Sequence, residues 1–187
     1  MPGEPALTTA RDPARLFLAL WPDEATRRAL QAWQAAVRWP PEARPTAPAH
    51  LHLTLHFIGA VPRDRLPALA DALGAEAGAF EACTLRLDGF AVWPRGIALL
   101  QPGRTEPALA RLHAALGAAL AAQGLPVETR PYRPHVTLAR HAAGAVLREG
   151  APPPPVPWPV REGFVLAESA GGYRVLRRWG GPGVPRP

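Results

Sequence analysis

His52-Leu53-Thr54-Leu55 and His135-Val136-Thr137-Leu138 are two copies of one short pattern, in which a histidine and a threonine stand two residues apart among aliphatic residues. In an extended strand, residues i and i+2 point to the same face of the sheet. Each copy therefore predicts a strand that presents an imidazole and a hydroxyl side by side and turns its aliphatic residues into the core. If the two strands are neighbours, two histidines and two threonines line one cleft.

These four side chains are suited to acid–base chemistry on a phosphate ester. Opening a cyclic phosphodiester needs a base that deprotonates water and an acid that protonates the departing sugar oxygen. Because the ordinary pKa of histidine is about 6.5, one ring can be neutral while its partner is protonated near neutral pH. Threonine hydroxyls can donate hydrogen bonds to phosphate oxygens, on which charge builds in the transition state. The predicted cleft thus needs no metal and no cofactor.

The composition predicts a single globular domain that spans residues 1–187. Hydrophobic residues make up 48% of the chain and charged residues 19%, which suffices for a core. No apolar run is long enough to cross a membrane, and the chain does not start with the basic and apolar segments of a secretory signal. Cys83 is the only cysteine, which excludes an internal disulfide. We therefore expect a cytoplasmic protein, and a monomer because nothing in the sequence requires an oligomer or an obligate protein partner.

The charge of the chain favours an anionic partner. Its 21 basic residues are all arginine, and the net charge is +6. Nucleic acid is the first candidate for a basic protein of this kind. The absence of lysine excludes a P-loop nucleotide site, a Schiff base and the lysine–adenylate intermediate of an ATP-dependent ligase.

Hydrophobic periodicity along the chain predicts an α+β fold. We expect strands over residues 16–21, 51–58, 80–93, 97–101, 135–140, 164–168 and 173–179, and helices over 22–39, 63–78 and 105–123. Since each half of the chain delivers one His-x-Thr strand, we expect a bilobal structure of two pseudo-symmetric, mostly antiparallel sheets, flanked by helices, with the motifs in a central cleft. Thr105 is expected to cap the third helix. The proline-rich segment 152–159 is expected to be an extended, exposed connector, and 180–187 a disordered tail.

The two motifs and their flanks resemble the signatures of the 2H phosphoesterase superfamily. The stretches that carry the resemblance are Arg15-Leu16-Phe17-Leu18-Ala19-Leu20, His52-Leu53-Thr54-Leu55 with the following Phe57-Ile58-Gly59, and Arg130-Pro131-Tyr132-Arg133-Pro134-His135-Val136-Thr137-Leu138-Ala139-Arg140. They are most similar to bacterial and archaeal RNA 2′,3′-cyclic phosphodiesterases, historically called 2′-5′ RNA ligases. The resemblance implies metal-independent hydrolysis of a 2′,3′-cyclic phosphate at an RNA 3′ end, such as that of a tRNA fragment, to a 2′-phosphomonoester. Reversible 2′-5′ ligation without ATP is the side activity that it implies.

The resemblance also implies roles for individual residues. His52 would be the acid on the leaving 3′ oxygen and His135 the base on water, although the symmetry of the motifs permits the reverse. Thr54 and Thr137 would hold the phosphate. Arg140 matches an arginine that helps to bind the phosphate in relatives, and its alternative is a surface arginine at a strand end.

Two residues that precede the second motif are further substrate-binding candidates. Arg130 would extend the phosphate path, unless it is a solvated loop charge. Tyr132 would stack on a base, as aromatic residues do in RNA sites, unless it packs against its own loop. Relatives often have a longer element before the last strand than the one between Ser169 and Tyr173, which bears on specificity.

Two other functions compete with this interpretation. A non-catalytic RNA-end-binding module would hold RNA in the basic cleft and yield no product under any condition. A metallohydrolase would use His50, His52 and His56, which share strand parity. In a straight strand, however, the outer two would lie about 20 Å apart, so we expect no metal site and expect His56 to be a satisfied polar residue. His113 falls on a helix and is expected on the surface.

Overall fold

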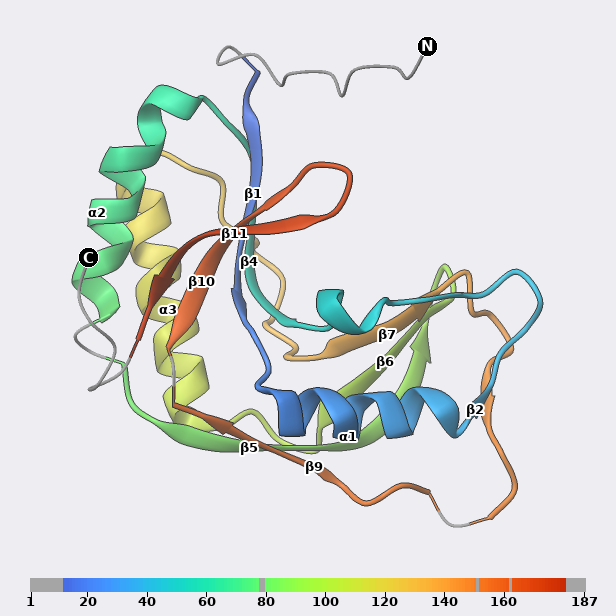
Figure 1. Ribbon diagram of the computed structural model, residues 1–187. Coiled ribbons are helices and arrows are strands. Elements are labelled where there is room, and N and C mark those ends of the chain that lie inside the picture. The colour runs from blue at the N-terminus through green and yellow to red at the C-terminus, as the bar shows by residue number, and fades with distance from the viewer. Residues whose placement is uncertain (1–11, 78–79, 151, 162, 181–187) are drawn as a thin grey trace, which may run out of the picture.

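Antiparallel pairing organises the strands of the computed structural model, which describes residues 12–77, 80–150, 152–161 and 163–180 (Figure 1). The strands are β1 (Ala14–Leu20), β2 (Val37–Arg38), β3 (Arg44–Pro45), β4 (Leu53–Val61), β5 (Cys83–Trp93), β6 (Ile97–Pro102), β7 (Val136–Arg140), β8 (Val146–Leu147), β9 (Val156–Val160), β10 (Phe164–Ser169) and β11 (Tyr173–Trp179). The helices are α1 (Glu24–Ala35), α2 (Leu66–Ala77) and α3 (Pro107–Ala122), with short 3₁₀ turns η1 (Pro48–His50) and η2 (Arg63–Arg65). The predicted tail lies outside the described residues from 181 onward.

Two groups of four strands form the two lobes. The first lobe has the order β11-β10-β1-β4 and the second the order β7-β6-β5-β9, with β3 beside β7. The lobes join through one residue pair, Leu53 of β4 with Val136 of β7, so that a single nine-stranded sheet runs through both. A separate two-stranded sheet pairs β2 with β8. The predicted α+β class with two antiparallel lobes is confirmed.

The helices cover the lobes unequally. α2 and α3 lie side by side against the first lobe, whereas α1 follows β1 in the chain but runs along the second lobe (Figure 1). The Asp23 carboxylate caps α1 by accepting a hydrogen bond from the backbone N–H of Thr26 at 2.7 Å. α1 ends at Ala35, before the predicted residue 39, because Val37 and Arg38 pair with β8. Within the described residues, no helix is both long and apolar enough to span a bilayer.

The third helix starts differently from its prediction. α3 begins at Pro107, and its N-cap is Glu106, whose side chain makes no capping hydrogen bond. Proline suits the first helical position because its missing N–H has no partner there. The prediction that Thr105 caps this helix is therefore wrong.

The proline-rich segment is part of the sheet, not an exposed connector. Its second half forms β9, which pairs with β5 at the edge of the second lobe. Val156, Trp158 and Val160 alternate into the core, and Trp158 is only 2% exposed. Proline tolerates an edge strand because one side of that strand needs no backbone donor. The Trp33 indole N–H of α1 also donates to the Pro154 carbonyl at 3.0 Å, which fastens the segment to the helix.

Candidate active site

The two motifs meet at the residue pair that joins the lobes. Leu53 and Val136 lie opposite each other on antiparallel strands, and both are fully buried. In antiparallel strands the residue numbers run in opposite directions from such a pair. Thr54 therefore lies across from His135, and His52 lies across from Thr137. Because side chains alternate, all four point away from the buried face. The residues brought together on this face are His52, Thr54, His135 and Thr137.

The rings of His52 and His135 are oriented by the same kind of hydrogen bond, and each histidine lies one residue before its strand. The Nδ1–H of His52 donates to the carbonyl of His50 at 2.7 Å, and the Nδ1–H of His135 donates to the carbonyl of Arg133 at 2.7 Å. A carbonyl oxygen can only accept, so Nδ1 carries the hydrogen in each ring. In the neutral rings Nε2 is therefore the basic nitrogen, and it is the atom available to a substrate.

A β-bulge in β7 explains how Arg140 reaches this face. The pairing with β6 skips Leu138, so that β7 holds one extra residue directly after Thr137. A bulge shifts the alternation of the strand. Leu138 and Ala139 are consequently both buried, and Arg140 emerges exposed on the face of Thr137.

The same bulge recurs at the equivalent point of β4. Here the pairing with β1 skips Leu55, directly after Thr54. His56 is turned into the core, at 3% exposure, and Phe57 emerges with 56% exposure. Residues 52–57 and 135–140 have the same burial class at every position, which shows the pseudo-twofold symmetry in detail. Strict alternation would put His56 on the same face as His52 and Thr54, but this bulge interrupts the alternation before His56.

His56 belongs to a column of stacked rings behind the site. Its Nε2–H donates to the carbonyl of His113 at 2.8 Å, as expected for a satisfied polar residue. The His113 ring stacks on His56 at 4.0 Å and on Tyr132 at 3.8 Å, so the expectation that His113 lies on the surface is wrong. Burial and the charge of neighbouring His56 lower the pKa of His113 to about 4.

Tyr132 occupies the end of this column. Its hydroxyl donates to the carbonyl of Thr54 at 3.4 Å, and burial raises its pKa. With its ring stacked on His113, the side chain supports β4 from behind. The ring thus packs against α3 rather than against its own loop, and its role in stacking on a base stays a prediction.

Aromatic side chains enclose the two histidines. Around His52, the ring centroids of Phe17, Trp21 and Tyr173 lie at 5.0, 5.4 and 5.1 Å, with the Trp21 ring stacked parallel to the imidazole. Trp93 lies 4.6 Å from His135. These aromatic residues were not among the predicted site residues, although Phe17 and Trp21, four residues apart, would share one face of a strand.

A buried carboxylate fixes the hairpin that carries Tyr173. Glu168 is 2% exposed and accepts hydrogen bonds from Arg63 at 2.5 Å and from Arg174 at 2.6 Å. Burial alone would raise the pKa of Glu168, but the two arginines outweigh burial and lower it. The residue next to Tyr173 is thus tied to the sheet, which keeps the Tyr173 ring against His52.

The electrostatics of the site favour neutral histidines in the free protein. Burial lowers the pKa of His52, and the charges of His135, His50 and Arg140 lower it further, while the hydrogen bond to the His50 carbonyl opposes them. Burial and the charge of Arg140 likewise lower the pKa of His135, against the opposing hydrogen bond to the Arg133 carbonyl. Arg140 therefore acts on both rings. An anion bound between them would raise both pKa values.

A family model described as the 2′-5′ RNA ligase superfamily matches residues 21–172. The chain belongs to this superfamily. The resemblance drawn from the two motifs is thereby confirmed.

Two curated relatives and one solved structure place the chain more closely within the 2′-5′ RNA ligase superfamily. The RNA 2′,3′-cyclic phosphodiesterase of Escherichia coli (strain K12) is 36% identical over 181 residues, covering 90% of this chain and 97% of the relative. The enzyme of the same name from Thermus thermophilus is 35% identical over 171 residues, covering 83% of this chain and 81% of the relative. The crystal structure of E. coli LigT complexed with 3′-AMP matches with a TM-score of 0.74 and 30% identity, covering 91% of this chain and 99% of that one.

Arg130 is paired with a carboxylate of its own loop. Its side chain is exposed and forms an ion pair with Glu128, which holds the pKa of that carboxyl at about 2. The charge of Arg130 is not among those that shift the pKa of His52 or His135. A role for Arg130 in substrate binding stays a prediction, to which the structure adds no support.

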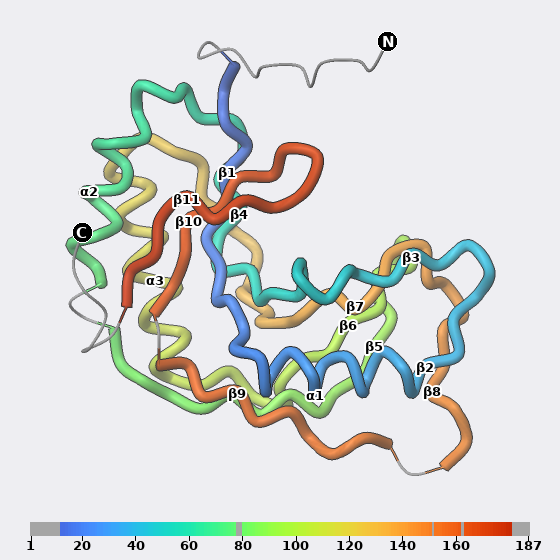
Figure 2. The backbone as a smooth tube through the Cα atoms, in the orientation of Figure 1, coloured from blue at the N-terminus to red at the C-terminus, as the bar shows by residue number. Residues whose placement is uncertain are grey.

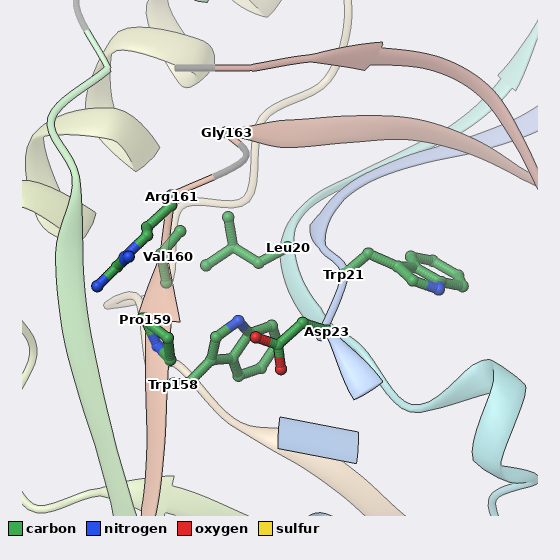
Figure 3. Close-up of a pocket in the computed structure, with 8 residues that line it drawn as sticks. All are labelled: Leu20, Trp21, Asp23, Trp158, Pro159, Val160, Arg161 and Gly163. Atoms are coloured by element: carbon green, nitrogen blue, oxygen red, sulfur yellow. The ribbon is translucent and has the colours of Figure 1, made fainter. Parts of the chain in front are cut away.

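A pocket of about 230 Å³ lies behind β1 and is distinct from the paired motifs (Figure 3). Leu20, Trp158 and Val160 gather on one side of the strand, whereas the Trp21 ring extends to the other side, where it meets His52. The Asp23 carboxylate in this lining is already engaged as the cap of α1. The one carboxylate of the lining is therefore engaged, and Arg161 is the other charged residue that lines the pocket.

The histidine cluster that suggested a metallohydrolase is not assembled. His50 lies in η1, and the bulge turns His56 into the core. Across the ranges that the structure describes, no three histidine, cysteine, aspartate or glutamate side chains come together in a group that could hold a metal ion.

Proposed function

We propose that the chain is an RNA 2′,3′-cyclic phosphodiesterase, which hydrolyses the cyclic phosphate at an RNA 3′ end to a 2′-phosphomonoester without a metal ion. The observation that carries the proposal is the symmetric pair of imidazoles, each with Nδ1–H fixed on a carbonyl and Nε2 available on the shared face. The relatives named RNA 2′,3′-cyclic phosphodiesterase support the same activity. RNA ends such as those of tRNA fragments are the proposed substrates, and a monomer in the cytoplasm is the proposed working form.

The proposed reaction uses one histidine as base and the other as acid. The neutral Nε2 of His135 takes a proton from water as the water oxygen forms a bond to phosphorus. The bond between phosphorus and the 3′ oxygen breaks, and the protonated Nε2 of His52 gives its proton to that oxygen. The products are a 2′-phosphate and a free 3′-hydroxyl, and exchange with solvent restores both rings. The symmetry of the site allows the two roles to be exchanged.

The remaining polar groups on this face would stabilise the transition state. The hydroxyls of Thr54 and Thr137 would donate to the non-bridging phosphate oxygens, and Arg140 supplies a positive charge that acts on both histidines. Donors that are fixed before the reaction stabilise developing charge most effectively. The anionic phosphate would also raise the pKa of the acid histidine, so that it holds its proton near neutral pH.

The same site would support ligation as a side reaction. If a 5′-hydroxyl replaces water, its oxygen bonds to phosphorus while the bond to the 3′ oxygen breaks, which yields a 2′-5′ linkage. No ATP is required because the strained cyclic ester supplies the driving force. Water is far more abundant than RNA 5′ ends, so we expect hydrolysis to dominate.

The lowered pKa values predict an acidic optimum. The active form of the free enzyme has one neutral and one protonated histidine, so kcat/KM should follow a bell-shaped curve. Activity falls below the lower pKa as the base is protonated, and above the higher pKa as the acid loses its proton. Since both pKa values are lowered from 6.5, the maximum should lie below pH 6.5.

An Arg140→Gln variant tests the origin of these shifts. Removing the charge that lowers both histidine pKa values should move the kcat/KM optimum to higher pH, besides weakening binding. Initial rates across a pH series measure the effect, and Arg111→Gln, an exposed α3 residue paired with Glu81, is the control. An optimum that stays in place or moves to lower pH in Arg140→Gln would contradict this account of the site electrostatics.

A further inference from the structure

Two arginines stand directly opposite each other on the second lobe. Arg44 of β3 pairs with Arg140 of β7, and both residues are exposed. Directly opposed side chains in an antiparallel pair have Cβ atoms about 4.5–5.5 Å apart, and like charges there destabilise the sheet. Among the described residues no carboxylate forms an ion pair with either arginine, whereas eight other arginines have such a partner. The pair is an unneutralised double positive charge.

The backbone beneath Arg44 is held firmly. The N–H of Thr46 donates to the carbonyl of Leu138, the extra residue of the β7 bulge, at 2.8 Å. The side-chain amide of Gln34 on α1 donates to the carbonyls of both Thr46 and Leu138 at 2.9 Å. The bulge that turns Arg140 toward the site therefore also anchors the strand that places Arg44 beside it.

More unpaired arginines continue this charge away from the histidines. β2, β3 and β8 lie together at one end of the second lobe (Figure 2). Two backbone hydrogen bonds join further segments to this end of the lobe. The N–H of Arg148 donates to the carbonyl of Ala36 at 2.9 Å, and the N–H of Ala142 donates to the carbonyl of Gly96 at 2.8 Å. Within the described ranges, the exposed arginines at this end that form no ion pair are Arg38, Arg95 and Arg148.

The first lobe carries no arginine at the position that matches Arg140. At the position that corresponds to Arg140 by pseudo-symmetry it carries Phe57, over whose ring the Arg15 guanidinium lies at 5.8 Å. The two lobes are therefore alike in backbone but differ in what they offer to an anion. At this position the second lobe offers the guanidinium group of Arg140, whereas the first lobe offers an aromatic ring.

We propose that Arg44 binds a backbone phosphate of the RNA on the 5′ side of the reacting nucleotide, and that the β3–β7 edge is the path of the RNA strand. This inference rests on the proposed function, because it takes the cyclic phosphate to lie between the histidines beside Arg140. Successive phosphates match two adjacent guanidinium groups, which are well suited to bind phosphate oxygens. The bound polyanion would also cancel the repulsion that the pair carries when free.

Substrate length separates this role from a role at the reacting phosphate. A nucleoside 2′,3′-cyclic monophosphate has only the reacting phosphate, whereas a short oligoribonucleotide with the same end also has backbone phosphates. For Arg44→Gln we expect KM for the oligonucleotide to rise about threefold to tenfold at low salt, with kcat unchanged and with no change for the mononucleotide. An equal loss on both substrates would overturn the proposal.

A binding measurement tests the inference independently of turnover. Fluorescence anisotropy with a labelled oligoribonucleotide that ends in a 2′-phosphate should show weaker binding by Arg44→Gln and a salt slope smaller by about 0.7, the value for one phosphate contact on a single strand. Arg111→Gln, which removes the same charge from α3, should bind as the unsubstituted protein does. Affinity unchanged in Arg44→Gln, or reduced equally in the control, would refute the proposal. If neither substrate is hydrolysed but Arg44→Gln alone binds more weakly, the function fails and the RNA path stands.

The melting temperature separates binding from structural support. Because Arg44 and Arg140 repel each other, Arg44→Gln should melt at the same temperature as the unsubstituted protein or higher. A residue that merely held β3 in place would lower the melting temperature when replaced, and that result would count against the proposal.

Discussion

Replacing either His52 or His135 by alanine should reduce hydrolysis of a 2′,3′-cyclic phosphate end by at least about 10²–10⁴-fold, because each positioned acid or base contributes that much to the rate. The pair works as a unit, so the double variant should be little slower than either single variant. Single-turnover rates on a cyclic-phosphate oligoribonucleotide measure these effects, and circular dichroism shows that the variants are folded.

His141→Asn is the matched control for the histidine variants. His141 is exposed, follows Arg140 directly and has a positive φ of 53°, a conformation that asparagine tolerates. This variant should retain the rate of the unsubstituted protein. Activity retained in His52→Ala or in His135→Ala would refute two-histidine catalysis.

Trp158→Ala should lower the free energy of unfolding by about 3–5 kcal/mol, the usual cost of removing a buried indole from a core. Trp158 is 2% exposed and lies on β9, opposite Leu85 of β5. Urea unfolding followed by circular dichroism measures the loss. The prediction depends on β9 being a true sheet strand, contrary to what the proline content suggested.

Pro157→Ala provides the comparison for this variant. Pro157 is the exposed neighbour of Trp158 on the same strand, and its replacement should cost no more than about 1 kcal/mol, chiefly through the unfolded chain. If both substitutions cost equally little, the segment would be a surface connector and the core described for the second lobe would be wrong.

The sequence was sufficient to predict the α+β class and the pairing of the two motifs, because each depends on short-range alternation. It predicted β10 and β11 with their turn, and β5 and β6, to within a few residues. It failed at β9, where tertiary pairing with β5 outweighed the usual meaning of repeated proline. It also extended α1 too far, since the pairing of Val37 with β8 depends on residues over a hundred positions away.

The bulges after Thr54 and Thr137 limited the prediction of the site. Alternation alone puts His56 on the site face and turns Arg140 away from it, and both assignments reverse once one extra residue enters each strand. A bulge is a property of the pairing between two strands, so a single strand sequence does not reveal it. Arg44 was missed for the same reason, because its place beside Arg140 is set by the pairing of β3 with β7.

The most direct test of the central claim is incubation of the purified protein, in the presence of EDTA, with a short RNA that ends in a 2′,3′-cyclic phosphate, followed by separation of the 2′- and 3′-phosphate products. We predict conversion to the 2′-phosphate alone, since the acid histidine protonates the 3′ oxygen and no metal ion takes part. Conversion to the 3′-phosphate, or activity only after a metal ion is added, would contradict the account. RNA that binds but stays unconverted would indicate the non-catalytic binding module instead.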